Sequence, residues 1–121
     1  MLLDSNIIIY LAHPEYEFLL DTLEEQDLYV SVISEIEVFG YHKLDSSDYD
    51  YFTQLFEQMN ILPLSSAIVS KAIEFKKLKK MSLGDSIIAA TASIYKLTLI
   101  TRNTKDFEHI EGLDLLNPFG D

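Results

Sequence analysis

Short apolar runs alternate with longer amphipathic stretches along the chain. The short runs are rich in leucine, isoleucine and valine, which is typical of strands buried in a sheet. One run contains Pro63, so we expect it at a sheet edge or close to a strand end. The expected strands cover residues 2–4, 28–32, 61–64, 97–101 and 113–116.

The stretches between these runs have apolar residues at helical spacing. In segment 47–59 they recur at i, i+1, i+4, i+5 and i+8 and mark one helix face. Segment 84–96 is apolar nearly all round, which predicts a buried helix. Because strands and helices alternate, we expect an α/β domain with a mainly parallel sheet. The other expected helices cover residues 6–12, 15–25, 34–41 and 66–80.

The composition fits one domain over residues 1–121, and 48% hydrophobic residues are enough for a core. The chain has no cysteine, which excludes disulfides and thiolate metal sites. No apolar run reaches the roughly 18 residues of a membrane span. The first apolar stretch lacks a preceding basic region, which argues against a signal peptide. We therefore expect a soluble cytoplasmic protein.

The formal net charge is −11, which argues against a broad nucleic-acid-binding surface. Five of the nine basic residues nevertheless lie in one short segment, KAIEFKKLKKM, from Lys71 to Lys80. Two interpretations stay open. The lysines form a solvated helix face, or they form a local strip that attracts phosphate groups.

Four acidic residues follow or begin predicted elements. They are Asp4, Glu37, Asp85 and Asp106. Three come just after predicted strands, and the fourth opens the buried helix. Ligands of an open parallel sheet bind beyond the carboxyl ends of its strands, so these acids are expected to converge there. Asp4 is the most conspicuous, because it interrupts the apolar stretch MLLDSNIIIYLA.

Helix capping is the competing explanation for each acid. Capping boxes have the pattern [ST]-x-x-[DE], which the sequence matches at Ser34-x-x-Glu37 and Ser82-x-x-Asp85 and approaches at Asn103-x-x-Asp106. Asp4 is itself a possible N-cap residue. If Asp4 has another role, Ser5 and Asn6 are expected to cap the helix that follows.

Convergence of four carboxylates would raise their pKa values unless a cation lies among them. Mg²⁺ or Mn²⁺ suits such a site, because both prefer oxygen ligands. A metal held in this way lowers the pKa of a bound water and neutralises charge on a phosphate. The acids therefore indicate metal-assisted hydrolysis of a phosphodiester.

The same residues lie in four blocks that occur in a fixed order. The blocks are LLDSN, VSVISEIEVFG, LGDSIIAATA and LITRNTKDFEHIEGLDLLNP. With them the chain resembles the PIN-domain ribonucleases, in particular the VapC-type toxins of toxin–antitoxin pairs. The resemblance implies a three-layer α/β/α sandwich and an endoribonuclease dependent on Mg²⁺ or Mn²⁺. It also implies inhibition by a cognate antitoxin protein and a homodimer.

The resemblance assigns metal binding and catalysis to Asp4, Glu37, Asp85 and Asp106. The first block reads DSN where DTN is commoner, and some relatives carry an acid at the position of Asn103. Whether Asn103 or Asp106 reaches the metal is therefore left open. Glu35 and Glu37 point about 200° apart on a helix, so only one of them faces the site.

Further residues are expected to support these acids. Ser31 and Thr101 are candidates for orienting the carboxylates or the phosphate, with a purely structural role as the alternative. The candidates for contact with the RNA backbone are Lys76, Lys77, Lys80, Arg102 and Lys105. Two other functions are considered: a receiver-like phosphoacceptor domain, which also places acids and Mg²⁺ at strand ends, and a catalytically silent binding module with the PIN fold.

Overall fold

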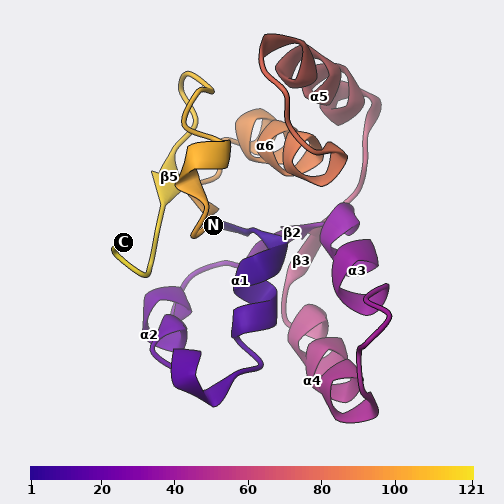
Figure 1. Cartoon of the computed structure of the whole chain (residues 1–121), viewed down its shortest axis with the longest axis vertical. Coiled ribbons are helices and arrows are strands. Elements are labelled where there is room, and N and C mark those ends of the chain that lie inside the picture. Colours follow the sequence, from indigo (N-terminus) through magenta and orange to yellow (C-terminus); the bar gives the residue numbers. More distant parts are fainter.

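The computed structural model describes residues 1–121, and a five-stranded sheet forms its centre (Figure 1). Every strand pair is parallel, and the strand order is β3-β2-β1-β4-β5. The first strand therefore lies in the middle of the sheet. The strands are β1 Leu2–Leu3, β2 Tyr29–Ser31, β3 Asn60–Leu62, β4 Leu99–Ile100 and β5 Leu115–Leu116.

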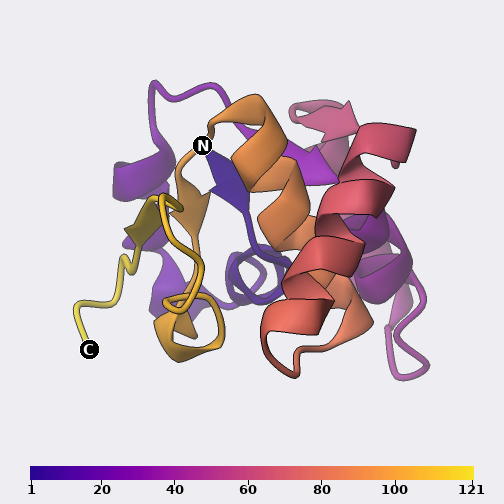
Figure 2. The same ribbon diagram turned by 90° about the horizontal axis from the view of Figure 1, so that it is seen from above.

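Helices cover both faces of the sheet, and Figure 2 shows the α5–α6 pair packed on one side of the strands. The helices are α1 Ser5–Tyr10, α2 Leu19–Leu23, α3 Val32–Phe39, α4 Ser46–Glu57, α5 Ser66–Leu78 and α6 Leu83–Tyr95. Two short 3₁₀ helices are η1 Pro14–Tyr16 and η2 Thr104–Asp106. None of the helices combines the length and the apolar character that a bilayer-spanning segment requires.

The sheet separates two hydrophobic clusters. Leu2 and Leu99 point into the cluster under α5 and α6, whereas Leu3 and Ile100 point into the cluster under α1, α2 and α4. All four side chains are fully buried. Successive residues of a strand face opposite sides, so strands of two residues are enough to anchor both helical layers. This arrangement confirms the expected α/β/α sandwich.

The expected helix at residues 15–25 is the clearest difference from the sequence prediction. The chain forms η1, a turn and the short helix α2 instead. Tyr16 packs against Tyr10 and Phe119, with ring centroids 4.9 and 5.5 Å apart, and Phe18 also contacts Phe119. These contacts with the C-terminal segment direct both rings to one side, which a continuous helix through 15–25 does not allow.

Candidate functional site

Asp4 joins β1 to α1 at the centre of the sheet. It occupies the N-cap position of α1, but its side chain makes no capping hydrogen bond. Its Oδ2 instead accepts a hydrogen bond of 2.8 Å from the hydroxyl of Thr101, directly after the neighbouring strand β4. Both residues are buried, Asp4 with 5% of its surface exposed. Thr101 is fixed in turn, because its Oγ1 accepts from the backbone N–H of Asn103 at 3.1 Å.

Glu37, on α3, is held by a serine from the first helix. The hydroxyl of Ser5 donates to Glu37 Oε1 at 2.7 Å, and it also lies 2.8 Å from the hydroxyl of Ser34. The expected capping of α1 by Ser5 is therefore wrong, because this hydroxyl is directed at α3. Ser34 is fully buried, and it lies within α3 rather than at its start.

Gly84 permits the close approach of α6 to Glu37. A Cβ atom added at Gly84 would lie 2.8 Å from Glu37 Oε2 and 3.2 Å from its Cδ. The glycine of the LGDS segment thus leaves space for the carboxylate of a different helix. Sequence reasoning did not single out Gly84, since a glycine in the first turn of a helix has no visible partner in the sequence.

Asp85 lies one residue further along α6, in its first turn and half-buried. Its backbone N–H donates to the side chain of Ser82 at 3.1 Å, so Ser82 is the N-cap of this helix. Capping by Ser82 leaves the Asp85 carboxylate available for another role. Asp85 and the exposed Asp106, at the end of η2, line a common pocket of about 440 Å³.

The four acids act on one another electrostatically. Burial raises the pKa of Asp4 to about 6, and the charges of Asp85 and Glu37 contribute to this rise, although the Thr101 hydrogen bond opposes it. The pKa of Asp85 is also raised, first by burial and then by the charges of Asp106 and Glu37. The charges thus link Asp4 to Asp85 and Glu37, and link Asp85 to Glu37 and Asp106.

These residues fit a hard divalent cation by their chemistry. Carboxylate oxygens are the ligands that Mg²⁺ and Mn²⁺ prefer. A cation would compensate both the burial and the repulsion that raise the pKa values of Asp4 and Asp85. No three acidic or histidine side chains are gathered closely enough to hold one ion together. Mg²⁺ needs only one or two protein carboxylates, because water completes its coordination.

The capping alternatives separate in the structure. Ser31, not Ser34, is the N-cap of α3, and its hydroxyl accepts from the N–H of Ile33 at 3.1 Å. Asn103 is the N-cap residue of η2, but its side chain makes no capping hydrogen bond. Glu35 is directed away from the acids, into a groove described below. The hydroxyl of Ser31 is thus engaged by the backbone, whereas that of Thr101 touches the site.

The basic candidates are placed differently from one another. Lys80 and Lys105 line the pocket of Asp85 and Asp106, together with Lys79 from the same lysine-rich segment as Lys80. Lys77 is exposed near the end of α5. Lys76 donates to the backbone carbonyl of Met81 at 2.8 Å, so it ties the end of α5 to the loop before α6.

Arg102 contacts the C-terminal segment rather than the acidic pocket. Its guanidinium lies 4.1 Å from the ring centroid of Phe119 and binds Asp121 Oδ2 at 3.0 Å. This ion pair and the aromatic contact tie Arg102 to the C-terminal segment. The adjacent arginine is therefore turned away from the lysines that line the acidic pocket.

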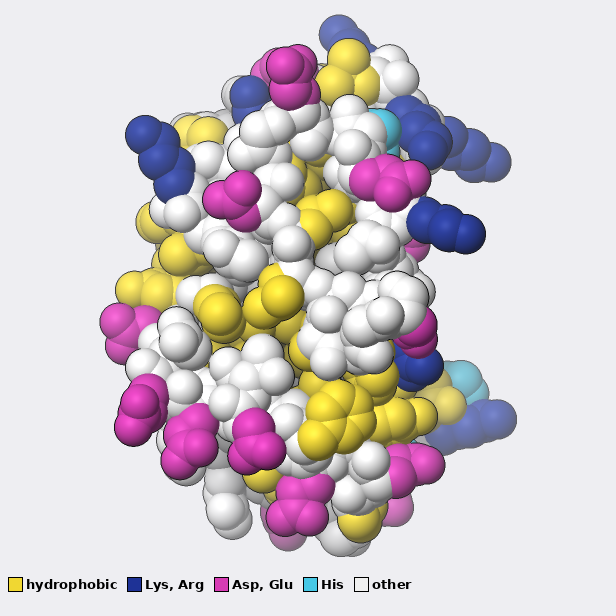
Figure 3. All heavy atoms as spheres, turned by 90° about the vertical axis from the view of Figure 1, so that its left-hand side faces the viewer, with side chains coloured by type: hydrophobic (Ala, Val, Ile, Leu, Met, Phe, Trp, Pro, Cys, Tyr) yellow, Lys and Arg dark blue, Asp and Glu magenta, His cyan; other side chains and the backbone are white.

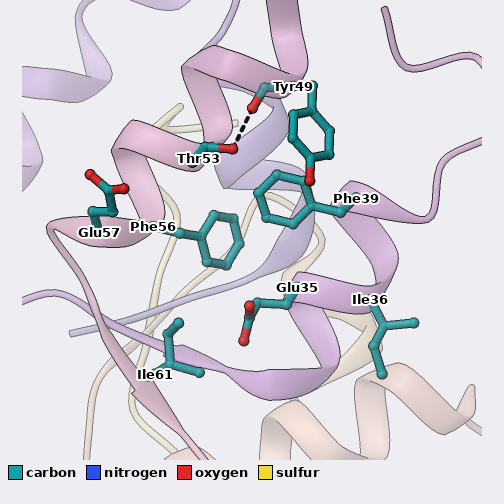
Figure 4. Close-up of a pocket in the computed structure, with 8 residues that line it drawn as sticks. All are labelled: Glu35, Ile36, Phe39, Tyr49, Thr53, Phe56, Glu57 and Ile61. Atoms are coloured by element: carbon teal, nitrogen blue, oxygen red, sulfur yellow. Dashed lines mark hydrogen bonds between the residues drawn. The ribbon is translucent and has the colours of Figure 1, made fainter. Parts of the chain in front are cut away.

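A groove lies between α3 and α4, beside the edge strand β3 (Figure 4). Its volume is about 510 Å³. Phe39 and Phe56 face each other across it, and their ring centroids lie 5.1 Å apart. The remaining lining residues are Glu35, Ile36, Tyr49, Thr53, Glu57 and Ile61. The groove is thus apolar, carries two acids and contains no basic side chain.

Comparison with known proteins agrees with this geometry. Residues 1–113 match the model of the PIN domain family. The chain belongs to the PIN domain family. No curated protein sequence matches this PIN domain.

Solved structures similar to this PIN domain include a chain of a toxin–antitoxin complex. A chain of a toxin–antitoxin complex from Klebsiella pneumoniae is 32% identical, with a TM-score of 0.79 and coverage of 97% of this chain and 96% of that one. A chain of FitAcB from Neisseria gonorrhoeae is 26% identical, with a TM-score of 0.78 and 99% coverage of both. A chain of DNA-bound VapBC2 from Rickettsia felis is 26% identical, with a TM-score of 0.75 and 96% coverage of both.

Proposed function

We propose that this protein is a metal-dependent endoribonuclease and the toxin of a toxin–antitoxin pair. The observation that carries the proposal is the buried carboxylate of Asp4, which Thr101 fixes at 2.8 Å and which Asp85 and Glu37 repel. A carboxylate in this environment is costly unless a cation compensates it. The fold and 32% identity shared with a chain of a toxin–antitoxin complex support the toxin role.

Each acid has a defined part in the proposed reaction. Asp4 and Asp85 would hold Mg²⁺ or Mn²⁺ at the end of the central strands, and Glu37 and Asp106 would complete the shell or orient the attacking water. When bound, the metal would lower the pKa of that water and stabilise charge on the phosphate. Thr101 and Ser5 keep Asp4 and Glu37 in fixed orientations. The carboxylate oxygens that these hydroxyls do not bind would be available to the metal.

The receiver-like alternative has weaker support. A phosphoacceptor site needs paired acids after the first strand and a lysine after a late strand. Asp4 is followed by Ser5, and β4 is followed by Thr101 and Arg102. A catalytically silent PIN module could carry the same residues as an active enzyme. The RNA cleavage assay distinguishes the two, because a silent module would not cleave RNA.

We propose an antitoxin protein as the partner and the groove between α3 and α4 as the place where a segment of it binds. Glu35 and Glu57 in an apolar groove favour a segment with leucine-like side chains and basic residues. Ile36 would be a central contact, because 64% of its surface is exposed. We further propose that the toxin acts in the cytoplasm, as a homodimer.

The decisive experiment is incubation of the purified protein with a mixed RNA pool. We expect cleavage with Mn²⁺ or Mg²⁺ and none in EDTA. Asp4→Asn should abolish cleavage, and Asp50→Asn, which changes an exposed acid of α4, should leave it intact. The proposal fails if the wild type cleaves nothing with either metal, or if Asp4→Asn cleaves as well as the wild type.

A further inference from the structure

The net negative charge of the chain lies in the first half of the sequence. Residues 1–60 contain thirteen acidic residues and one basic residue, whereas residues 61–121 contain seven acidic and eight basic residues. Figure 3 shows a related separation on one face: most lysine and arginine side chains lie towards the end formed by α5 and α6, and acidic ones prevail at the other end. The net charge of −11 therefore does not describe the surface around the site.

Three lysines meet the acids in the pocket of about 440 Å³. Lys79 and Lys80 come from the loop between α5 and α6, and Lys105 comes from η2. The acids of the same pocket are Asp85 and Asp106. Two segments that are separate in sequence thus place basic side chains on the rim of the proposed metal site.

The ammonium groups of these lysines have no partner in the protein. The chain forms two salt bridges, Lys71–Glu74 and Arg102–Asp121, and neither includes a lysine of the pocket. Lys79, Lys80 and Lys105 are exposed, and none donates a side-chain hydrogen bond, in contrast to Lys76. Three unpaired positive charges at the edge of a pocket are available to an anion.

We infer that Lys79, Lys80 and Lys105 bind the RNA phosphates next to the one that is cleaved, one phosphate for each lysine. This inference rests on the proposed nuclease function and adds the path of the substrate. The acids repel any RNA phosphate that is not bound to the metal. The lysines would attract these neighbouring phosphates and so hold the RNA strand beside the acids. The RNA strand then passes between the α5–α6 loop and η2, away from the acidic groove of α3 and α4. The lysines are positioning residues and not catalytic ones.

Binding of RNA phosphates by these lysines should make the RNA affinity depend on the salt concentration. Each lysine that neutralises a phosphate of single-stranded nucleic acid contributes about 0.7 to the slope of log affinity against log salt. Removing three such contacts should lower the slope by about 2. At about 0.15 M salt this corresponds to roughly fourfold weaker binding per lysine, or about 50-fold for all three.

The test measures binding of a labelled single-stranded RNA between about 50 and 200 mM salt, in EDTA and in Mg²⁺. We compare wild type with the triple variant Lys79→Gln, Lys80→Gln, Lys105→Gln. The control triple variant, Lys43→Gln, Lys71→Gln, Lys96→Gln, changes the net charge equally but lies outside the pocket. We expect the predicted loss of slope and affinity only in the first variant. Arginine at positions 79, 80 and 105 should restore both.

Cleavage kinetics separate this inference from the nuclease proposal. The pocket variant should raise KM and leave kcat within about twofold, because the acids that act on the scissile phosphate are unchanged. RNA binding with the expected lysine dependence but without any cleavage would refute the nuclease and retain the phosphate subsite. No RNA binding by the wild type, or an equal loss in both triple variants, would overturn the subsite.

Discussion

Asp4 carries an unfavourable charge that depends on pH. Its pKa is about 6 in the folded protein, against an ordinary value of 3.8. The folded chain therefore holds this proton more tightly than the unfolded chain, so the stability that Asp4 contributes is complete below 3.8 and is lost as the pH rises towards 6. The difference between the two pKa values corresponds to about 3 kcal/mol at neutral pH.

We predict that Asp4→Asn raises the free energy of unfolding by about 1 to 3 kcal/mol at pH 7 in EDTA. Asparagine keeps an oxygen acceptor for Thr101 but carries no charge. The gain should shrink towards zero near pH 4, and Mg²⁺ or Mn²⁺ should stabilise the wild type more than the variant. Urea unfolding at several pH values measures this, with Asp50→Asn as the control. A variant less stable than wild type in EDTA would contradict the repulsion among the acids.

Gly84 provides a second test at the residue scale. Alanine favours a helix interior over glycine by about 1 kcal/mol, so Gly84→Ala should not destabilise α6. The new methyl group would however displace the Glu37 carboxylate, which lies 2.8 Å from the Cβ position. We predict unchanged or higher stability together with weaker stabilisation by metal and at least tenfold lower cleavage. Ser66→Ala, on α5, controls for helix propensity. Full metal response in Gly84→Ala would show that Glu37 does not need this position.

The four acids could be named from the sequence, and so could Thr101, which holds Asp4, but the residues that contact Glu37 could not. Ser5 and Gly84 are common residue types at helix starts, and their contacts with Glu37 come from helices that are distant in sequence. Lys79 was indistinguishable from its neighbours in the KAIEFKKLKKM segment for the same reason. Local patterns report which residues share a helix face, not which other element approaches that face.

At the scale of elements, α3 begins without a loop after β2. Ser31 is the last residue of the strand and the N-cap of the helix. The sequence prediction started this helix at residue 34, after a β-rich run over residues 28–32. The apolar periodicity located strands and helices well, whereas the exact start of a helix depends on which hydroxyl reaches a free backbone N–H.

We predict that Ser31→Ala lowers the free energy of unfolding by about 1 kcal/mol, the usual value of an N-cap. The stabilisation by Mg²⁺ should remain as in the wild type, because the Ser31 hydroxyl is engaged with Ile33 rather than with the acids. Chemical unfolding with and without metal measures both effects. A loss of the metal effect without a loss of stability would instead support the role first considered for Ser31, that of orienting a carboxylate or phosphate.

At the scale of the whole molecule, two ligands are expected on two faces. The groove between α3 and α4 is apolar and acidic, whereas the pocket of Lys79, Lys80 and Lys105 is basic at its rim. Their opposite charge should keep RNA out of the groove and a basic protein segment out of the pocket.

We predict that a synthetic amphipathic peptide rich in leucine and arginine binds the wild type and that Ile36→Lys weakens this binding at least tenfold. RNA binding by Ile36→Lys should stay within about twofold of the wild type. Fluorescence anisotropy with each ligand measures both, and a peptide with glutamate in place of arginine is the control. Equal binding of the two peptides would contradict the role of Glu35 and Glu57.

The hydrogen bond between Thr101 and Asp4 joins residues 97 positions apart in the chain. β1 is synthesised before the other four strands, yet one of its two neighbours in the sheet, β4, is the fourth of the five in chain order. Closing so large a loop requires most of the chain to be present. A nascent chain that stops before residue 99 lacks both β4 and the hydroxyl that orients Asp4. Completion of the chain through β4 is thus a prerequisite for an ordered Asp4 side chain.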